Sequence, residues 1–393
     1  MASANHCANT TDNVLTKQQS DQLMSCHLLE LVPMQAGRNH DFAGLRIDDF
    51  YRPIIPHPAP DVTDQGDPYL LTVPRSSASS YSYYLYHTDV SREGDRIAVY
   101  GSHDLRQFQY LGKALQADAP MSEHWAPCVV YDASARRYNM FYSRSTPHQS
   151  NADIGQRLRR AVADRPEGPF IDQGEMPLEL ETDFAIDADV YQRHDQQSGR
   201  LAHFLAYVVE FWNETRVGVG IVEVKLSPDL ARPESAPRVL VKPSLDVQIY
   251  ERGRSMPWQV GRRDWAGGET VDWHCIEAPI GGVVSPAGAT FYLTSFGSYK
   301  DETYAVGAVR EEADGRATDL AEEGHAVLRS GMLPGIVSAG HPSLVTRNLL
   351  LSHGRFTPGG DRRAFFAPLL WDDQDRPYCP TRDQLVRVLG QAS

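Results

Sequence analysis

The sequence predicts an all-β protein: a five-bladed β-propeller with a short N-terminal helical extension. Three observations lead to this fold class. Most of the chain consists of short apolar or aromatic runs broken by Gly, Pro, Asp and Ser, which is typical of antiparallel strands and their turns. Helical patterns are confined to the two ends of the chain. Five segments of similar order recur along its body, as expected for repeated sheets.

The first residues differ in pattern from the rest of the chain. Apolar side chains recur at helical spacing over residues 23–32, with polar residues between them. We therefore expect one helix there, and we divide the chain into an extension over residues 1–40 and a propeller over residues 41–393. Near the other end, residues 383–389 have the pattern of a second short helix.

The body of the chain contains short runs with the composition of strands. Examples are residues 81–87, 138–143, 201–209, 218–224, 290–295 and 349–353. Many short strands separated by turn residues are typical of sandwiches, barrels and propellers, in which few or no sheet edges stay exposed.

Five segments within this body begin alike. Each starts with a polar or acidic residue beside small ones, continues as an apolar strand, and returns as an aromatic-rich strand. They start at Asp67, His124, Asp187, Glu277 and His341. Most starts lie roughly sixty residues apart, which suits one four-stranded blade with its loops. The longer interval before Glu277 predicts an insertion, placed in the charged, Pro-rich residues 227–264.

The composition is that of an ordinary globular protein, with 41% hydrophobic and 23% charged residues among 393. The formal net charge of −13 argues against a nucleic-acid partner, because nucleic-acid-binding surfaces are basic. No run approaches the roughly 18 apolar residues of a membrane span, and no secretory signal is recognised, so we expect no membrane partner and a cytoplasmic location. The five scattered cysteines predict neither a zinc site nor a disulfide framework.

The segment starts carry the residues that indicate chemistry. In a propeller, the innermost strand of each blade lines a central channel, so its first residues surround one mouth of that channel. Asp67, Asp187 and Glu277 would bring three carboxylates together there, and His341 would add an imidazole. Glycosidic bond hydrolysis needs one carboxylic acid to protonate the leaving oxygen and one carboxylate to activate water or attack the sugar. The convergence supplies both.

The ordered set of motifs resembles glycoside hydrolase family 43 over nearly all of residues 50–375. The segments that look like successive blade openings of that family are Asp67-Pro68, Trp125-Ala126-Pro127, Ile186-Asp187, Ile276-Glu277-Ala278-Pro279 and Gly340-His341. Residues 102–108 are similar to its turn in the first blade, and residues 161–170 are similar to the strand end ahead of its third blade. Residues 363–373 resemble its fifth blade.

The resemblance implies an inverting hydrolase of terminal α-L-arabinofuranosyl or β-D-xylosyl groups. It implies that Asp67 is the general base, Glu277 the general acid, and Asp187 the carboxylate that orients the acid and keeps it protonated. His341 matches a histidine at the channel centre, which in many members helps to hold a calcium ion or its water. Arg363 matches a basic residue that lines the sugar site. The reaction itself requires no cofactor, and a structural calcium ion in the channel is the one metal expected.

This chain departs from the family pattern at Cys128, where the second blade usually carries an acidic residue. Some of the matched residues also have a plainer explanation. An Asp before Pro, such as Asp67, is usually a turn former, and Glu277 could be a paired core carboxylate. Asp189 competes with Asp187, because alternation places both on one strand face, where the spare carboxylate would accept a hydrogen bond. His341 could equally be a hydrogen-bonded structural histidine.

Aromatic side chains are the candidates for sugar-stacking walls. These are His124, Trp125, Trp212 and Trp273. Sugar faces pack on aromatic rings, although core packing is the expected role of at least one of these residues.

Two alternatives to a pentosidase stay open at this point. One is a glycosidase or transglycosylase that acts on a sugar-decorated small metabolite, and the other is a carbohydrate-binding propeller without turnover. All three hypotheses make a carbohydrate or glycoside the partner, and the sequence predicts no oligomeric state.

Overall fold

The computed structural model describes residues 41–59, 62, 64–73, 79–89, 97–116, 123–145, 155–182, 184–195, 198–212, 214–255 and 270–390. The described residues belong to one compact unit built mainly of antiparallel strands. The helix expected over residues 23–32 and the boundary at residue 40 lie outside them and stay predictions. The short helix near the C-terminus is confirmed as α2 (Arg382–Gly390).

Five blades succeed one another along the chain, and the strands of blades 3 and 4 are joined into one sheet. Blade 1 contains β1 (Gly66–Thr72), β2 (Tyr83–Thr88), β3 (Ala98–Ser102) and β4 (Gln109–Lys113). Blade 2 contains β5 (His124–Asp132), β6 (Arg137–Ser145), β7 (Gln156–Ala163) and β8 (Ile171–Glu175). Blade 3 contains β9 (Ala185–His194), β10 (Leu201–Phe211), β11 (Gly218–Lys225) and β12 (Arg238–Val241).

Blade 4 contains β14 (Thr270–Val284), β15 (Thr290–Phe296), β16 (Ala305–Glu311) and β17 (Ala317–Asp319), with β18 (Leu328–Arg329) also paired to β16. Blade 5 contains β19 (Val337–Thr346), β20 (Leu349–Arg355) and β21 (Arg362–Pro368). The smaller elements are η1 (Ile47–Asp49), η2 (Asp246–Gln248), η3 (Leu320–Glu323), β22 (Leu370–Trp371) and β23 (Pro377–Tyr378). Among the described helices, none has the length and apolar character needed to cross a membrane.

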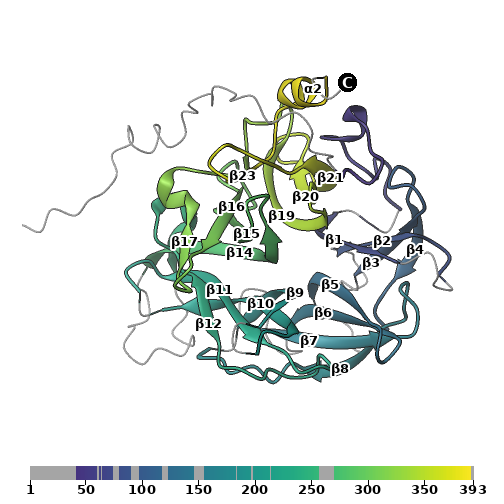
Figure 1. The fold of residues 1–393 in the computed structure, drawn as a ribbon, viewed down its shortest axis with the longest axis vertical. Coiled ribbons are helices and arrows are strands. Elements are labelled where there is room, and N and C mark those ends of the chain that lie inside the picture. Colours follow the sequence, from purple (N-terminus) through teal and green to yellow (C-terminus); the bar gives the residue numbers. More distant parts are fainter. Residues whose placement is uncertain are drawn as a thin grey trace, which may run out of the picture. The chain divides into compact units, whose positions relative to one another are not determined.

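The five blades close into a ring through their first strands. β1 contacts β5, β5 contacts β9, β9 contacts β14, β14 contacts β19, and β19 returns to β1. Figure 1 shows the blades following one another around a common centre. The predicted five-bladed propeller is therefore confirmed.

The beginning of the described chain completes the fifth blade. The amides of Tyr51 and Ile54 donate to the carbonyls of Phe366 and Ala364 in β21, at 3.1 and 3.0 Å. This pairing covers the outer edge of β21, which would otherwise present unpaired backbone groups. It also joins residues before the first blade to the last blade of the ring.

A separate apolar cluster fills each junction between neighbouring blades. Representative pairs, in ring order from the junction of blades 1 and 2, are Tyr86 and Met140, Phe141 and Leu205, Ile221 and Tyr292, Leu293 and Phe365, and Leu351 and Leu85. Burying one such Leu or Phe side chain contributes about 1.5–3 kcal/mol. The ring is therefore stabilised mainly by side-chain packing between blades, since backbone pairing lies mostly within each blade.

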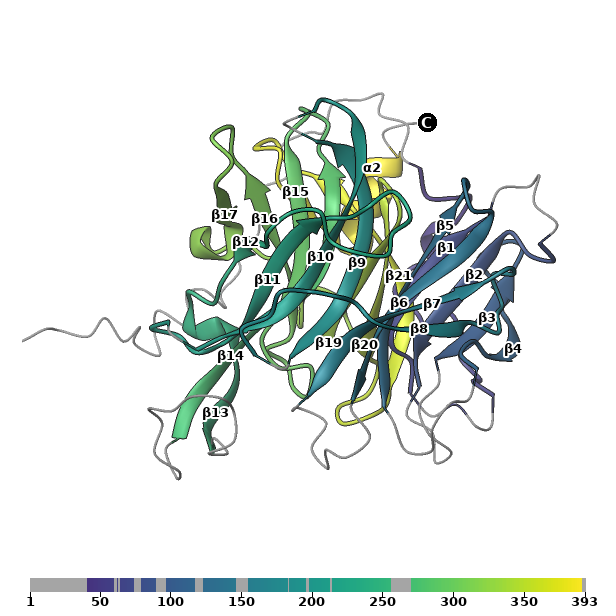
Figure 2. The ribbon, with the colours of Figure 1, turned by 90° about the horizontal axis from the view of Figure 1, so that it is seen from below.

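The long interval between the third and fourth blades holds an additional strand, β13 (Ile249–Ser255). β13 pairs with the first half of β14, which also runs parallel to β11 over two residue pairs and so joins these two blades. Figure 2 shows β13 and this half of β14 extending past the neighbouring strands. The insertion predicted over residues 227–264 is confirmed in its described part.

Candidate active site

The first strand of every blade contains a non-glycine residue with a positive φ angle at a β-bulge, and β19 contains a second one, Ser338 (φ 54°), near its start. The five bulge residues at equivalent positions are Asp67 (φ 52°), Ala126 (47°), Asp187 (55°), Ala278 (52°) and His341 (47°). A positive φ at a residue with a Cβ costs about 1–3 kcal/mol and is kept where the surrounding structure enforces it. Bulges beside active sites re-aim side chains, and all five bulge residues line one small void at the centre of the ring.

The bulges give a more accurate alignment of the repeats than the sequence did. In blades 2 and 4 the equivalent positions are Ala126 and Ala278, and not His124 and Glu277. Glu277 precedes its bulge and lines the pocket beside the void, whereas Asp67 and Asp187 occupy the bulges and line both spaces. The three carboxylates therefore converge as predicted, but from two different backbone positions.

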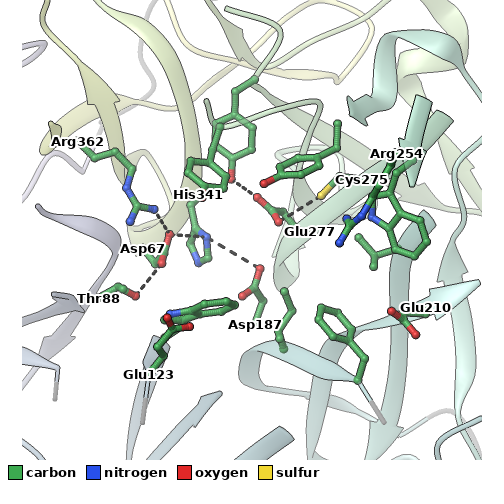
Figure 3. A pocket seen from close by; sticks show the side chains of 18 residues that line it. Asp67, Thr88, Glu123, Asp187, Glu210, Arg254, Cys275, Glu277, His341 and Arg362 are labelled. Carbon is green, nitrogen blue, oxygen red and sulfur yellow. Dashed lines mark hydrogen bonds and ion pairs between the residues drawn. The ribbon is translucent and has the colours of Figure 1, made fainter. Parts of the chain in front are cut away.

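The pocket has a volume of about 310 Å³ and receives side chains from all five blades. Its carboxylates are Asp67, Glu123, Asp187, Glu210 and Glu277, and its aromatic walls are Trp125, Phe184, Tyr250, Trp273, Tyr299 and Tyr304. Figure 3 shows His341 between Asp67 and Glu277, with Asp187 below Glu277 in this view.

Asp67 is held as a carboxylate by positively charged and hydrogen-bonding neighbours. Its Oδ1 lies 3.1 Å from Nδ1 of His341 and accepts a hydrogen bond from Nη1 of Arg362 at 3.1 Å. Its Oδ2 accepts one from the Thr88 hydroxyl at 2.7 Å. Burial alone would raise the pKa of Asp67, but His341 and Arg362 outweigh it and lower this pKa well below the ordinary range. Asp67 is thus ionised and suited to accept a proton.

The backbone of Asp67 is fixed by a neutral histidine. Its amide donates to Nδ1 of His353 at 3.1 Å, so this nitrogen acts as an acceptor. Burial, followed by the charge of Arg362, lowers the pKa of His353 well below its ordinary value. A neutral His353 at working pH agrees with its role as acceptor.

Glu277 accepts hydrogen bonds at both carboxyl oxygens. The Tyr304 hydroxyl donates to Oε1 at 2.6 Å, and the Cys275 thiol donates to Oε2 at 3.2 Å. Burial, and then the charge of Glu277, raises the pKa of both donors well above their ordinary values, so both stay protonated. Gly340 makes room for Tyr304, because a Cβ there would lie 2.0 Å from Cε1 of that ring.

Asp187 lies within the junction between blades 3 and 4. Its amide donates to the Ser143 hydroxyl at 3.2 Å, and its Oδ2 accepts a hydrogen bond from the Ala278 amide at 3.1 Å. Burial, followed by the charges of Glu277 and Asp67, raises the pKa of Asp187 well above its ordinary value. Burial and these neighbouring negative charges disfavour the ionised form of Asp187, so this carboxyl group keeps its proton.

Asp189, two residues after Asp187, accepts a hydrogen bond, as expected for the spare carboxylate of this strand. Its Oδ2 accepts a hydrogen bond from the Gly281 amide at 2.7 Å, and burial raises its pKa to about 7. It lines the central void and not the pocket.

The calcium expectation concerns the central void, which the five bulge residues line. It measures about 20 Å³, enough for about one water molecule. Among the described residues, no three His, Cys, Asp or Glu side chains are grouped to hold a metal, whereas Ca²⁺ takes six to eight oxygen ligands. Nδ1 of His341 is already engaged with Asp67. These residues do not fit a directly ligated calcium ion, and the metal role of His341 stays a prediction.

Of the expected sugar walls, Trp125 and Trp273 line the pocket. His124 does not: it is 3% exposed and its ring packs beside Tyr142, with centroids 5.6 Å apart. Successive strand residues point to opposite faces, so the neighbour of Trp125 turns away from the pocket. Trp212 is also outside the lining, because it packs edge-on behind Trp273 at 5.1 Å. The substrate-binding predictions for His124 and Trp212 are corrected accordingly.

Two arginines, Arg254 and Arg362, line the pocket, and the one beside Asp67 is Arg362 and not the predicted Arg363. Arg362 binds both Asp67 and Asp64, whereas Arg363 pairs with Asp361 at 3.3 Å outside the pocket lining. The two arginines are adjacent on β21 and face opposite sides of the strand, which residue type alone does not distinguish.

Sequence reasoning also missed Glu123 and Tyr304, which both line the pocket. Glu123 stands two residues before Trp125, so the alternation of a strand could have placed it on the same side. Tyr304 lies just ahead of the third strand of blade 4, outside every segment start, and no local pattern marks it.

The glycosyl hydrolases family 43 model matches residues 67–376, which include every carboxylate of the pocket. The chain belongs to this family. It is therefore a glycoside hydrolase, of a family that acts with inversion of configuration. No curated protein matches the sequence as a relative.

Several solved structures share the fold. A thermostable family-43 glycoside hydrolase is 24% identical with a TM-score of 0.60, covering 82% of this chain and 95% of its own. An α-L-arabinofuranosidase from Lactobacillus brevis is 16% identical with a TM-score of 0.60, and the match covers 86% of this chain and 98% of that enzyme. An endo-1,4-β-xylanase from Bacteroides thetaiotaomicron is 19% identical with a TM-score of 0.55, and the match covers 81% of this chain and 95% of that enzyme.

Replacing Asp187 by Asn should move the high-pH limb of the kcat/KM profile to lower pH, by about 1–2 pH units. The reason is that Asn replaces a carboxyl group that interacts electrostatically with Glu277 by a neutral amide. KM should change little. The measurement is a pH–rate profile on an aryl glycoside, and an unchanged high-pH limb with full activity would show that Asp187 does not influence the acid.

Proposed function

We propose that the protein removes terminal pentosyl groups, α-L-arabinofuranosyl or β-D-xylosyl, with inversion of configuration. Asp67 is the general base, Glu277 is the general acid, and Asp187 keeps a proton available to Glu277. One observation carries the proposal: the surroundings shift the pKa values of two carboxyl groups in opposite directions. His341 and Arg362 lower the pKa of Asp67, whereas burial raises the pKa of Asp187, which lies beside Glu277. Opposite pKa shifts of this kind distinguish the base side of a catalytic site from its acid side.

In this mechanism, water enters between Asp67 and the anomeric carbon. Asp67 accepts a proton as the water oxygen attacks, and Glu277 donates a proton to the departing glycosidic oxygen. Tyr304 and Cys275 orient the Glu277 carboxyl through its two oxygens. Arg362 and Thr88 hold the Asp67 carboxylate in place.

The pocket supports a short glycoside as substrate. Its volume of about 310 Å³ is at the lower end of ligand pockets, and its aromatic walls suit the apolar faces of sugar rings. The solved relatives supply the choice of pentose, since one is named an arabinofuranosidase and another a xylanase. We further propose that the central void holds a water molecule and that catalysis needs no metal.

A cytoplasmic location is also part of the proposal. The cysteines among the described residues are Cys128, Cys275 and Cys379, all of them buried free thiols. Free thiols persist where the compartment is reducing. Cell fractionation should find the protein with soluble cytoplasmic markers, and its recovery in the culture medium or periplasm would contradict this location.

The test is hydrolysis of nitrophenyl α-L-arabinofuranoside and β-D-xyloside beside a panel of glycosylated metabolites. Proton NMR of the first product should show the anomer opposite to that of the substrate. The rate should be the same in EDTA and in added Ca²⁺. Retention of configuration would overturn the inverting assignment, and turnover of a metabolite glycoside alone would replace the pentosidase proposal. Binding of sugars without turnover of any substrate would leave a carbohydrate-binding propeller.

A further inference from the structure

A repeated hydrogen bond joins neighbouring blades at four of the five junctions, all of which lie within the described residues. In each, the amide of a bulge residue donates to a side chain on the second strand of the preceding blade. The pairs are Ala126 with Thr88 at 2.8 Å, Asp187 with Ser143 at 3.2 Å, His341 with Ser295 at 2.8 Å, and Asp67 with His353 at 3.1 Å. A strained bulge thus has a defined acceptor for its amide.

The four acceptors occupy one register position. Each lies opposite the residue that precedes the bulge in its own blade. The pairs are Thr88 with Gly66, Ser143 with Trp125, Ser295 with Glu277, and His353 with Gly340. The position is therefore a repeated feature of the ring and can be compared between blades.

The junction between blades 3 and 4 is the exception. Its register position, opposite Ile186, holds Val208, which is fully buried and has no hydrogen-bond acceptor in its side chain. A buried amide without a partner is costly, by about 1–3 kcal/mol. The amide of Ala278 instead donates to Oδ2 of Asp187 at 3.1 Å. The Asp187 carboxylate thus replaces the missing acceptor.

Blade 1 shows what happens when the acceptor is present. The Thr88 hydroxyl accepts from Ala126 and donates to Oδ2 of Asp67, so the Asp67 carboxylate makes no bond to the next blade's amide. Asp67 and Asp187 occupy equivalent bulges, yet one becomes the base and the other lies against the acid. Their surroundings differ at the register position opposite the residue that precedes the bulge. This position holds Thr88 in blade 1 and Val208 in blade 3.

We propose that Val208 is a positioning residue for catalysis, on the basis of the function proposed above. Because its side chain accepts no hydrogen bond, the Ala278 amide binds Asp187 and holds this carboxyl group beside Glu277. A hydroxyl at position 208 would take the Ala278 amide, as Thr88 takes that of Ala126, and would release Asp187 from blade 4.

The test compares V208T with V208A. Threonine has nearly the shape of valine but adds an acceptor, whereas alanine removes volume and adds none. V208T should lower kcat by roughly 10-fold with little change in KM, because the misplaced Asp187 no longer supports the acid. It should also move the high-pH limb of the profile to lower pH, in the direction of D187N. V208A should keep the wild-type limb even though its Tm falls.

An unchanged kcat and pH limb in V208T would overturn the proposal, as would equal shifts in V208A and V208T, since packing alone would then explain both. V208S provides the same acceptor if V208T does not fold. A crystal structure of V208T is the second measurement, with the added hydroxyl oxygen expected about 3 Å from the Ala278 amide nitrogen. That structure tests the exchange of hydrogen bonds even if the wild type hydrolyses no pentoside, so failure of the proposed function is distinguishable.

Discussion

Asp67→Ala should lower kcat by about 10²–10⁴-fold on aryl and alkyl pentosides alike. Water must be deprotonated as it attacks, whichever group leaves, so a good leaving group cannot compensate for the loss of the base. Asp67 is suited to this role because Arg362 and His341 keep it ionised. Single-turnover kinetics on a nitrophenyl and a methyl pentoside, at several pH values, measure the loss.

Asp64→Asn is the matched control, because Asp64 binds the same Arg362 at 2.7 Å but does not line the pocket. It should retain most of the activity. Azide needs no deprotonation and fits the space left by the carboxylate, so it should restore turnover of the nitrophenyl substrate by D67A and give an inverted glycosyl azide. Full activity of D67A without azide, at a wild-type Tm, would exclude Asp67 as the base.

The fold was predictable because each blade repeats the same sequence pattern. Alternating strands, turn residues and an opening motif recur near Asp67 and Asp187, and a ring is the arrangement that covers the edges of such sheets. The convergence of the three carboxylates follows from that closure, even though Asp67 and Glu277 come from the first and fourth blades. The convergence of the carboxylates could therefore be predicted from the closure of the ring, without knowledge of side-chain positions.

The details of the site were not predictable, because they depend on the bulges. A bulge interrupts the alternation of a strand, so the expected equivalence of His124 with Asp67 was wrong by two residues. The choice between Arg362 and Arg363 depends on the register of β21, and the reach of Tyr304 depends on packing against Gly340. Val208 has no chemical signal at all in the sequence. Its significance comes from comparison with Thr88 at the equivalent position.

Glu277→Ala should separate substrates by their leaving groups. Alkyl pentosides and disaccharides need a proton on the departing oxygen and should lose about 10²–10⁴-fold in kcat, whereas dinitrophenyl pentosides should lose little. Glu277 is positioned for this transfer by Tyr304 and Cys275, which contact its two carboxyl oxygens. A plot of log kcat/KM against the pKa of the leaving group should therefore be much steeper for E277A than for the wild type.

The high-pH limb adds a second readout of the same role. The limb reports loss of the proton that the general acid donates, so in E277A it should disappear for dinitrophenyl pentosides, which do not require that proton. Glu210→Gln is the matched control: Glu210 lines the same pocket, but its Oε2 accepts a hydrogen bond from Trp212, and E210Q should keep the wild-type slope. If E277A lost activity equally on aryl and alkyl substrates, Glu277 would not be the proton donor. Asp187, which accepts a hydrogen bond from the Ala278 amide, would then be the next carboxyl group of the pocket to test as the donor.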